Sequence, residues 1–158
     1  MPSYKYFIDK GLTTLPEYWN FEELWWGMAR SRNHAMMGHV KEWFTKYLAG
    51  ISAVEVGYDV IDINPSVIDE LTSVSGTIDS VHGTITSAWE HDPTTGVFTL
   101  ELTLPVGVTA NVYIPKLSED QTILLDDEAV DTTATEDGRY MLVSEQIDSG
   151  SYTFTVQL

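Results

Sequence analysis

The chain has 158 residues, of which 43% are hydrophobic, and this length allows one domain or one domain with an appendage. Its 24 acidic and eight basic residues give a formal net charge of −16, so its surface repels a phosphate backbone and we expect no nucleic-acid partner. The absence of cysteine excludes disulfides and thiolate metal sites. No stretch reaches the roughly 18 consecutive apolar residues of a membrane span, so we expect no membrane partner.

The opening stretch, MPSYKYFIDKG, lacks the basic region and unbroken apolar run that a secretory signal needs. This observation leaves the compartment unknown, with the cytoplasm slightly favoured.

Charge and composition change at Gly50. The residues up to this glycine hold six basic and five acidic side chains, whereas the remainder holds two basic and 19 acidic side chains. Four of the five tryptophans precede Gly50, and valine and threonine dominate after it. We therefore predict a helical segment over residues 1–50 and a separate domain over residues 51–158. The acidic excess of the second domain is explained most simply by solubility.

The first of these regions predicts loops and helices. Residues 11–20 contain Pro16 and little periodicity, and a short helix is expected from about Glu22 to Ala29. Apolar side chains between Met36 and Leu48 recur at spacings of three and four, which is typical of one face of a helix. The pattern predicts a helix over Asn33–Leu48 that begins at an Asn33 N-cap and stops at Gly50.

The second region alternates between apolar and polar residues, as half-buried strands do. Turn sequences such as DPTTG, EDG and DSGS divide the alternating runs, and the first strand is expected within GYDVIDINP. The fold class predicted is therefore mainly β, an antiparallel β-sandwich preceded by an α-helical segment. The predicted strands are Tyr58–Ile63, Thr77–His82, Ile85–Trp89, Phe98–Leu104, Ala110–Ile114, Thr122–Leu125 and Tyr152–Val156.

A family resemblance rests on six stretches that occur in a fixed order. They are TTLPEYWN, SRNHAMMGHVKEWFTKYLAGI, GYDVIDINPS, GTIDSVHGTITSAWE, FTLELTLPVGVTANVYIP and GSYTFTV. In this order they resemble the C-terminal end of bacterial α-L-rhamnosidases, from about Thr13 to Leu158. The resemblance implies that residues 1–50 are the last part of a catalytic (α/α)6 barrel and that residues 51–158 are the C-terminal β-sandwich domain. It also implies that the general acid of the family lies upstream of this chain.

The resemblance assigns roles to three residues. Inverting hydrolysis of a glycosidic bond needs one carboxyl group to protonate the leaving oxygen and a second to deprotonate water. Glu17 matches the family's general base, and His34 and Trp19 match its substrate-binding positions. Two departures stand nearby, since Pro16 and Arg32 occupy positions where the family often has an aromatic residue.

Other readings of these residues remain open. Glu17 could be an ordinary loop acid, His34 a helix-entry residue with local hydrogen bonds only, and Trp19 a packing residue. We expect no cofactor and no metal, because His82 and His91 lack a zinc-binding spacing and the acidic turn LDDE lacks the ligand spacing of a calcium loop.

Two hypotheses about function follow. The first is that the chain is a C-terminal fragment of an α-L-rhamnosidase, which releases terminal α-L-rhamnose with inversion and acts on a rhamnose-containing glycoside only together with the upstream barrel. By itself the chain is then expected to be inactive. The alternative is a non-catalytic β-sandwich module for carbohydrate binding or protein association. The apolar helical surface, including Met36, Trp43 and Phe44, further predicts that the helical part either folds down on the sandwich or pairs with another copy of the chain.

Overall fold

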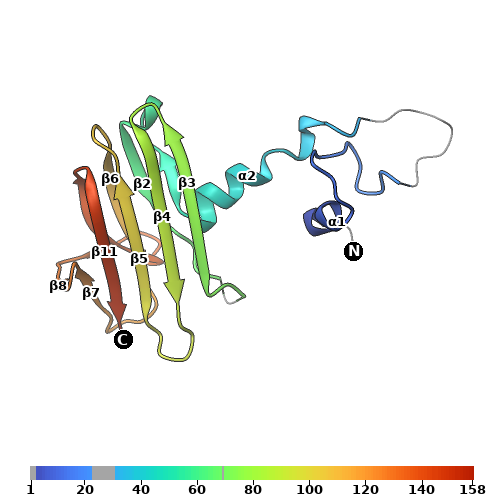
Figure 1. Cartoon of the computed structure of the whole chain (residues 1–158). Helices are drawn as coiled ribbons and strands as arrows, with labels where there is room; N and C mark the ends of the chain where they lie inside the picture. Colours follow the sequence, from blue (N-terminus) through green and yellow to red (C-terminus); the bar gives the residue numbers. More distant parts are fainter. Residues whose placement is uncertain (1–2, 23–30, 69) are drawn as a thin grey trace. The chain divides into compact units, whose positions relative to one another are not determined.

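The computed structural model describes residues 3–22, 31–68 and 70–158, and the chain forms two compact units, Met1–Glu42 and Trp43–Leu158 (Figure 1). The first contains short helices and loops, and the second contains the strands. The predicted fold class is confirmed, because the chain is mainly β, with largely antiparallel sheets that follow a short helical segment. The predicted division at Gly50 stays a prediction.

The first unit begins with helix α1, Tyr4–Asp9, which the sequence pattern did not predict. Its N-terminus is capped by Ser3, whose hydroxyl accepts a hydrogen bond from the Tyr6 N–H over 3.3 Å. The buried Phe7 on this helix belongs to an aromatic cluster, the small core of the unit. The buried members of this aromatic cluster are Phe7, Phe21 and Met37, and its half-buried members are Tyr4, Tyr6, Leu12, Leu15 and Trp19.

The single helix predicted over Asn33–Leu48 is wrong before Val40. The structure has a 3-10 turn η1, Ala35–Met37, then helix α2, Val40–Trp43, which continues as a π-helical turn η2, Phe44–Leu48. His34 is extended, with φ −118° and ψ 131°, because its N–H donates to the Leu15 carbonyl of another segment. A tertiary hydrogen bond therefore overrides the helical pattern at this end.

The predicted end of that helix is confirmed. The last helical residue is Leu48, Ala49 is the C-cap, and Gly50 adopts φ +78°, the left-handed conformation that favours glycine after a helix. The other predicted helix, from about Glu22 to Ala29, lies almost wholly outside the described residues.

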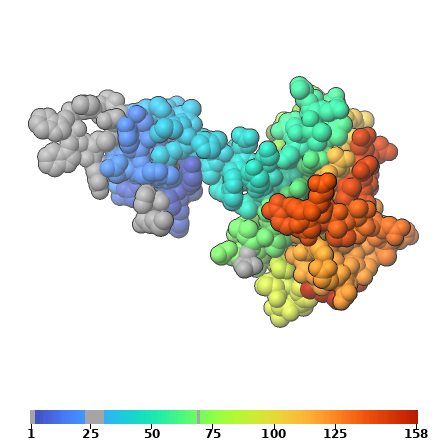
Figure 2. Space-filling model, turned by 180° about the vertical axis from the view of Figure 1, so that it is seen from behind, coloured from blue at the N-terminus to red at the C-terminus, as the bar shows by residue number. Residues whose placement is uncertain are grey.

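The second unit is built from two sheets. One has the strand order β1-β2-β6-β10-β9 and the other the order β3-β4-β5-β11-β7-β8. All pairings are antiparallel except that of β2 with β6. Figure 2 shows this unit from the side opposite to Figure 1, with the orange and red C-terminal part of the chain on the near face. The strands are β1 Ile51–Ala53, β2 Val60–Ile63, β3 Ser73–Ser80, β4 Gly83–His91, β5 Phe98–Leu104, β6 Thr109–Pro115, β7 Thr122–Leu125, β8 Glu128–Ala129, β9 Thr133–Ala134, β10 Tyr140–Ile147 and β11 Gly150–Gln157.

The predicted strands occur, β5 and β7 with the predicted ends and the others with shifted ends, and four further strands were not predicted. The expected first strand begins at Val60 rather than Tyr58, because Val56–Tyr58 forms the 3-10 turn η3 and Tyr58 has φ +69°. Strand β1 precedes it and is only three residues long. Strands β8, β9 and β10 were also not predicted, since β8 and β9 are two residues each and β10 contains bulges that break its alternation.

Alternation of side chains along the strands builds the core between the sheets. On β5, Phe98, Leu100 and Leu102 are buried, while Thr99 and Glu101 on the other face are partly or fully exposed. Strands β4, β6 and β11 follow the same rule. Their buried side chains form one continuous cluster, which accounts for the stability of the sandwich.

The C-terminal end of the helix enters this core. The Trp89 Nε1–H donates to the Leu48 carbonyl and the Ser87 hydroxyl donates to the Ala49 carbonyl, each over 2.7 Å and both buried. These carbonyls have no partner further along the helix, so the two side chains of β4 satisfy them. Gly76 on β3 allows the close approach, because a Cβ at this position would lie 2.4 Å from the Ala49 Cβ.

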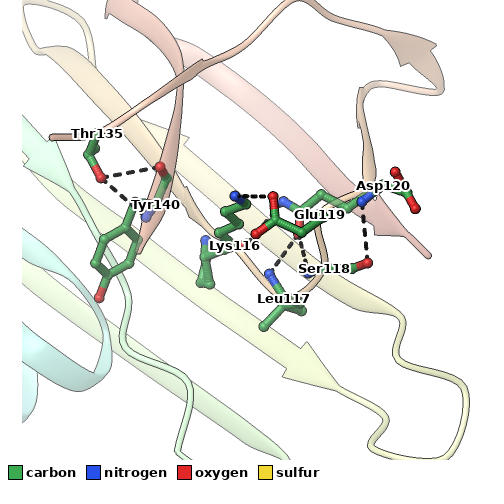
Figure 3. Close-up of polar contacts among 9 residues, drawn as sticks. Lys116, Leu117, Ser118, Glu119, Asp120, Thr135 and Tyr140 are labelled. Atoms are coloured by element: carbon green, nitrogen blue, oxygen red, sulfur yellow. Dashed lines mark hydrogen bonds and ion pairs between the residues drawn. The ribbon is translucent and has the colours of Figure 1, made fainter. Parts of the chain in front are cut away.

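The connection from β6 to β7 carries its own hydrogen bonds (Figure 3). The Gln121 side-chain oxygen accepts from the N–H groups of Leu117 and Ser118, over 2.6 and 3.1 Å, and its amide donates to the Pro115 carbonyl. Lys116 and Glu119 form an ion pair across the same turn. The crossing between the two sheets is therefore fixed locally and does not rely on strand pairing.

We expect Gly76→Ala to lower the free energy of unfolding by about 1–3 kcal/mol, since the added methyl group collides with Ala49. Urea unfolding of both forms measures the change. The outward-facing neighbour gives the control, because Ser75→Ala should change stability by less than about 0.5 kcal/mol. Adding Ala49→Gly to the Gly76→Ala form should restore part of the loss. Equal stability of the Gly76→Ala form and the parent would show that the junction tolerates the methyl group.

Ser87→Ala is expected to cost about 1–3 kcal/mol of stability, because it leaves the buried Ala49 carbonyl without the hydroxyl that donates to it. The loss should appear in urea unfolding followed by tryptophan fluorescence. Ser73→Ala, at an exposed position of β3, serves as the comparison. A Ser87→Ala form as stable as the Ser73→Ala form would contradict the assignment.

Candidate functional site

The candidate residues Glu17 and His34 lie on two neighbouring segments of the first unit. The His34 N–H donates to the Leu15 carbonyl over 2.8 Å, and the Glu17 N–H donates to the Ser31 carbonyl over 2.9 Å. From the first bond to the second, the residue number rises from 15 to 17 in one segment and falls from 34 to 31 in the other, so the two segments run antiparallel. We call residues 14–17 the base segment and residues 31–34 the histidine segment.

A side chain also joins these segments. The Thr14 hydroxyl donates to the Arg32 carbonyl over 2.5 Å. The Arg32 guanidinium in turn lies 5.5 Å from the centre of the Phe21 ring, so a cation–π contact ties the histidine segment to the aromatic cluster. The sequence identified Thr14 only as part of a family match and Arg32 only as a departure from it. Nothing in the pattern shows which hydroxyl reaches which carbonyl.

Pro16 fits the geometry of the base segment. It is buried and stands between Leu15, whose carbonyl accepts a hydrogen bond, and Glu17, whose N–H donates one. Since a proline has no N–H, it is tolerated between two residues that make the cross-segment bonds. Glu17 itself is half-buried, and its backbone is fixed by the bond to Ser31.

His34 stands where the histidine segment turns into η1. Its side chain is half-buried and makes no capping hydrogen bond to that turn. The position of the residue is set through its main chain, by the bond to Leu15. An imidazole placed in this way can donate to or accept from a hydroxyl group of a ligand.

Trp19 lies in the aromatic cluster. Its ring stacks on Phe7, with centroids 5.0 Å apart and planes 10° from parallel, and it meets the edge of Tyr4 at 5.2 Å. One face of the indole is therefore covered by the protein, and the residue is half-buried. The role of Trp19 in substrate binding stays a prediction, and so do the roles of Glu17 and His34.

Two other carboxylates of this unit are held in ion pairs. Glu22 accepts a hydrogen bond from the Tyr6 hydroxyl and pairs with Lys10 over 3.0 Å, and Asp9 pairs with Lys5. The Tyr6 hydrogen bond first, and the Lys10 hydrogen bond next, lower the pKa of Glu22 below its ordinary value. A general acid must carry its proton at working pH, so Glu22 is unsuited to that role.

The sandwich carries two adjoining hollows over strands β3, β4 and β5. Their volumes are about 430 and 340 Å³, and both are lined by Ser73, Glu90 and Thr99. These side chains are exposed or half-buried, and all are polar. Within the described residues, no group of three or more histidine, aspartate or glutamate side chains could hold a metal ion.

The helix that enters the sandwich exposes aromatic side chains. Trp43, Phe44 and Tyr47 are each close to half exposed, and the Trp43 ring contacts the rings of Phe44 and Tyr47. This surface agrees with the apolar helical face expected from the sequence, and pairing of two copies through it stays a prediction. No helix in the described part of the chain is long and apolar enough to span a membrane.

Two family models match consecutive parts of the chain. Residues 1–48 match the bacterial alpha-L-rhamnosidase 6 hairpin glycosidase domain, and residues 50–123 match the bacterial alpha-L-rhamnosidase C-terminal domain. The first match contains the base segment and the histidine segment. The second contains strands β1–β6.

Proteins similar to this chain are named alpha-L-rhamnosidase. An alpha-L-rhamnosidase of Streptomyces avermitilis is 34% identical over 98% of this chain, and the chain spans 15% of its length. The solved structure of alpha-L-rhamnosidase from Dictyoglumus thermophilum superposes with a TM-score of 0.84 at 28% identity, over 99% of this chain and 17% of that one. The Streptomyces avermitilis alpha-L-rhamnosidase complexed with L-rhamnose superposes with a TM-score of 0.80 at 32% identity, over 99% of this chain and 15% of that one.

We expect a carboxyl carbon NMR titration of Glu22 to give a midpoint below the ordinary value of 4.5, because Tyr6 and Lys10 stabilise the ionised form. The pair therefore adds stability at pH values above 4.5, and this contribution disappears as the pH falls through the lowered pKa. Tyr6→Phe should move the midpoint back toward 4.5, since it removes the largest cause. A midpoint at or above 4.5 in the parent chain would refute the pairing.

Proposed function

Because this chain belongs to the bacterial α-L-rhamnosidase family, we propose that it supplies the general base and part of the sugar-binding surface for hydrolysis of terminal α-L-rhamnosides. The chain covers the C-terminal part of such an enzyme, about 15% of the length of its relatives. The main observation behind this proposal is the antiparallel pairing of the base segment with the histidine segment, which supports a shared site for Glu17 and His34.

Glu17 is the proposed general base. In an inverting hydrolysis, its carboxylate takes a proton from a water molecule as the water oxygen attacks the anomeric carbon. The bond from that carbon to the leaving oxygen breaks, and this oxygen takes a proton from a second carboxyl group. The two carboxyl groups of inverting enzymes stand about 6.5–9.5 Å apart, which leaves room for the water.

The second carboxyl group is proposed to come from the portion of the enzyme that this chain does not span. Support comes from two other acids of the first unit, since Glu22 is stabilised as a carboxylate and Asp9 is paired with Lys5. A lone carboxylate can deprotonate water but cannot protonate the leaving group. We therefore expect the 158-residue chain alone to show no rhamnosidase activity.

His34 is proposed to hold a hydroxyl group of the rhamnose. Its backbone bond to Leu15 fixes the main chain of His34 against the base segment, so the sugar and the attacking water would be oriented by the same pair of segments. Trp19 is proposed as an outer wall of the sugar site through the parts of its ring that Phe7 and Tyr4 leave uncovered.

A fusion protein tests the role of Glu17. In it, this chain replaces the matching C-terminal portion of the Streptomyces avermitilis enzyme, which it resembles over 98% of its own length. The fusion should hydrolyse an aryl α-L-rhamnoside, and Glu17→Gln should lower kcat about 10²–10⁴-fold, the usual worth of one general base. Azide should restore turnover in a Glu17→Ala form and yield the β-configured rhamnosyl azide, because the anion attacks without needing a base.

The matched control is Glu42→Gln, the same substitution at an exposed glutamate of the same unit, which should leave kcat unchanged. Full activity of the Glu17→Gln fusion would refute the assignment of the base. An inactive parent fusion, together with rhamnose binding by the 158-residue chain at the hollows over β3, β4 and β5, would favour the non-catalytic module instead.

A further inference from the structure

The pairing of the base segment with the histidine segment is irregular. Between the two cross-segment bonds, the base segment advances two residues, from Leu15 to Glu17, whereas the histidine segment advances three, from Ser31 to His34. One residue is therefore in excess on the histidine side, as in a β-bulge, and its neighbours cannot all use the regular backbone pairing. The register of Glu17 against His34 depends on how this excess is held.

The side chain of Thr14 holds this irregular stretch in place. Its hydroxyl donates to the carbonyl of Arg32, which lies within the irregular stretch, over 2.5 Å. We infer that Thr14 is a positioning residue, whose hydrogen bond to Arg32 fixes the register of the segment that carries the general base Glu17 relative to the segment that carries the sugar-binding His34. The catalytic part of this inference rests on the proposed function, whereas the structural part does not.

The side chain of Arg32 is anchored as well as its carbonyl. Its guanidinium lies over the Phe21 ring, and Phe21 is buried in the aromatic cluster. Leu15, the residue that follows Thr14, packs against the same cluster. The Thr14 bond thus closes a small frame, in which both segments are attached to one core and to each other.

Such a frame matters for a general base. The carboxylate must stay within hydrogen-bond reach of the attacking water, and a displacement of about 1 Å can cost about 100-fold in rate. Backbone bonds alone permit the excess residue to shift along the pairing. The Thr14 hydroxyl selects one arrangement, although it contacts neither the water nor the sugar in this proposal.

Hydrogen exchange on the 158-residue chain tests the frame without any catalysis. Thr14→Val, which removes the hydroxyl at nearly equal volume, should speed exchange of the Glu17 and His34 amides by about two- to tenfold. Thr14→Ser should restore the slow exchange. Thr13→Val is the matched control, since Thr13 is the exposed neighbour of the same type, and it should leave both amides unchanged. Unchanged exchange in Thr14→Val would overturn the inference.

Kinetics of the fusion protein test the consequence for the reaction. Thr14→Val should lower kcat by up to about 100-fold and change KM by less than about threefold, whereas Thr14→Ser should recover most of kcat and Thr13→Val should behave as the parent. A merely structural role predicts a lower unfolding temperature with an unchanged kcat for the folded fraction, which would refute the positioning role. Should Glu17→Gln also leave kcat unchanged, the proposed function fails. A large Glu17→Gln effect with a normal Thr14→Val kcat would reject the role of Thr14 alone.

Discussion

Two buried hydrogen bonds hold the last turn of a helix to strand β4, within the strand-rich unit. Trp89 and Ser87 donate to the last carbonyls of the turn that ends at Ala49, and the small residue Gly76 lets that turn sit against strand β3. Buried carbonyls without a donor are costly, so this junction cannot slide or rotate freely. The sandwich therefore fixes the end of the chain segment that matches the glycosidase domain.

The first unit is held differently. Its core is a cluster of aromatic rings, and the proposed site is held against that cluster by backbone bonds and by side-chain contacts, among them the Thr14 hydroxyl and the Arg32 guanidinium. This division suits a site whose side chains must be placed accurately. The main chains of Glu17 and His34 are located by these backbone bonds.

Much of the sandwich could be predicted from the alternation of apolar and polar residues, because a pattern with a period of two shows which face of a strand is buried. Strand β5 was predicted with its observed ends for that reason, whereas β1 is too short to show a pattern and β10 is interrupted by bulges. The start of the predicted helix failed because the His34 N–H bonds to Leu15, and no periodicity encodes a bond to a distant loop. The link from Thr14 to Arg32 was unpredictable for the same reason, although both residues stood in recognisable stretches.

The one parallel pairing in the sandwich constrains how the protein folds. Strand β2 pairs with β6, with Val60 beside Thr109, and strands β3, β4 and β5 lie between the two partners along the chain. Hairpins such as β3–β4 can form locally, but this contact requires closure of a long loop, and non-local contacts slow folding. The sheet that contains β2 is thus expected to assemble after the hairpins of the opposite sheet, and until then its apolar face remains accessible to chaperones or to other unfinished chains.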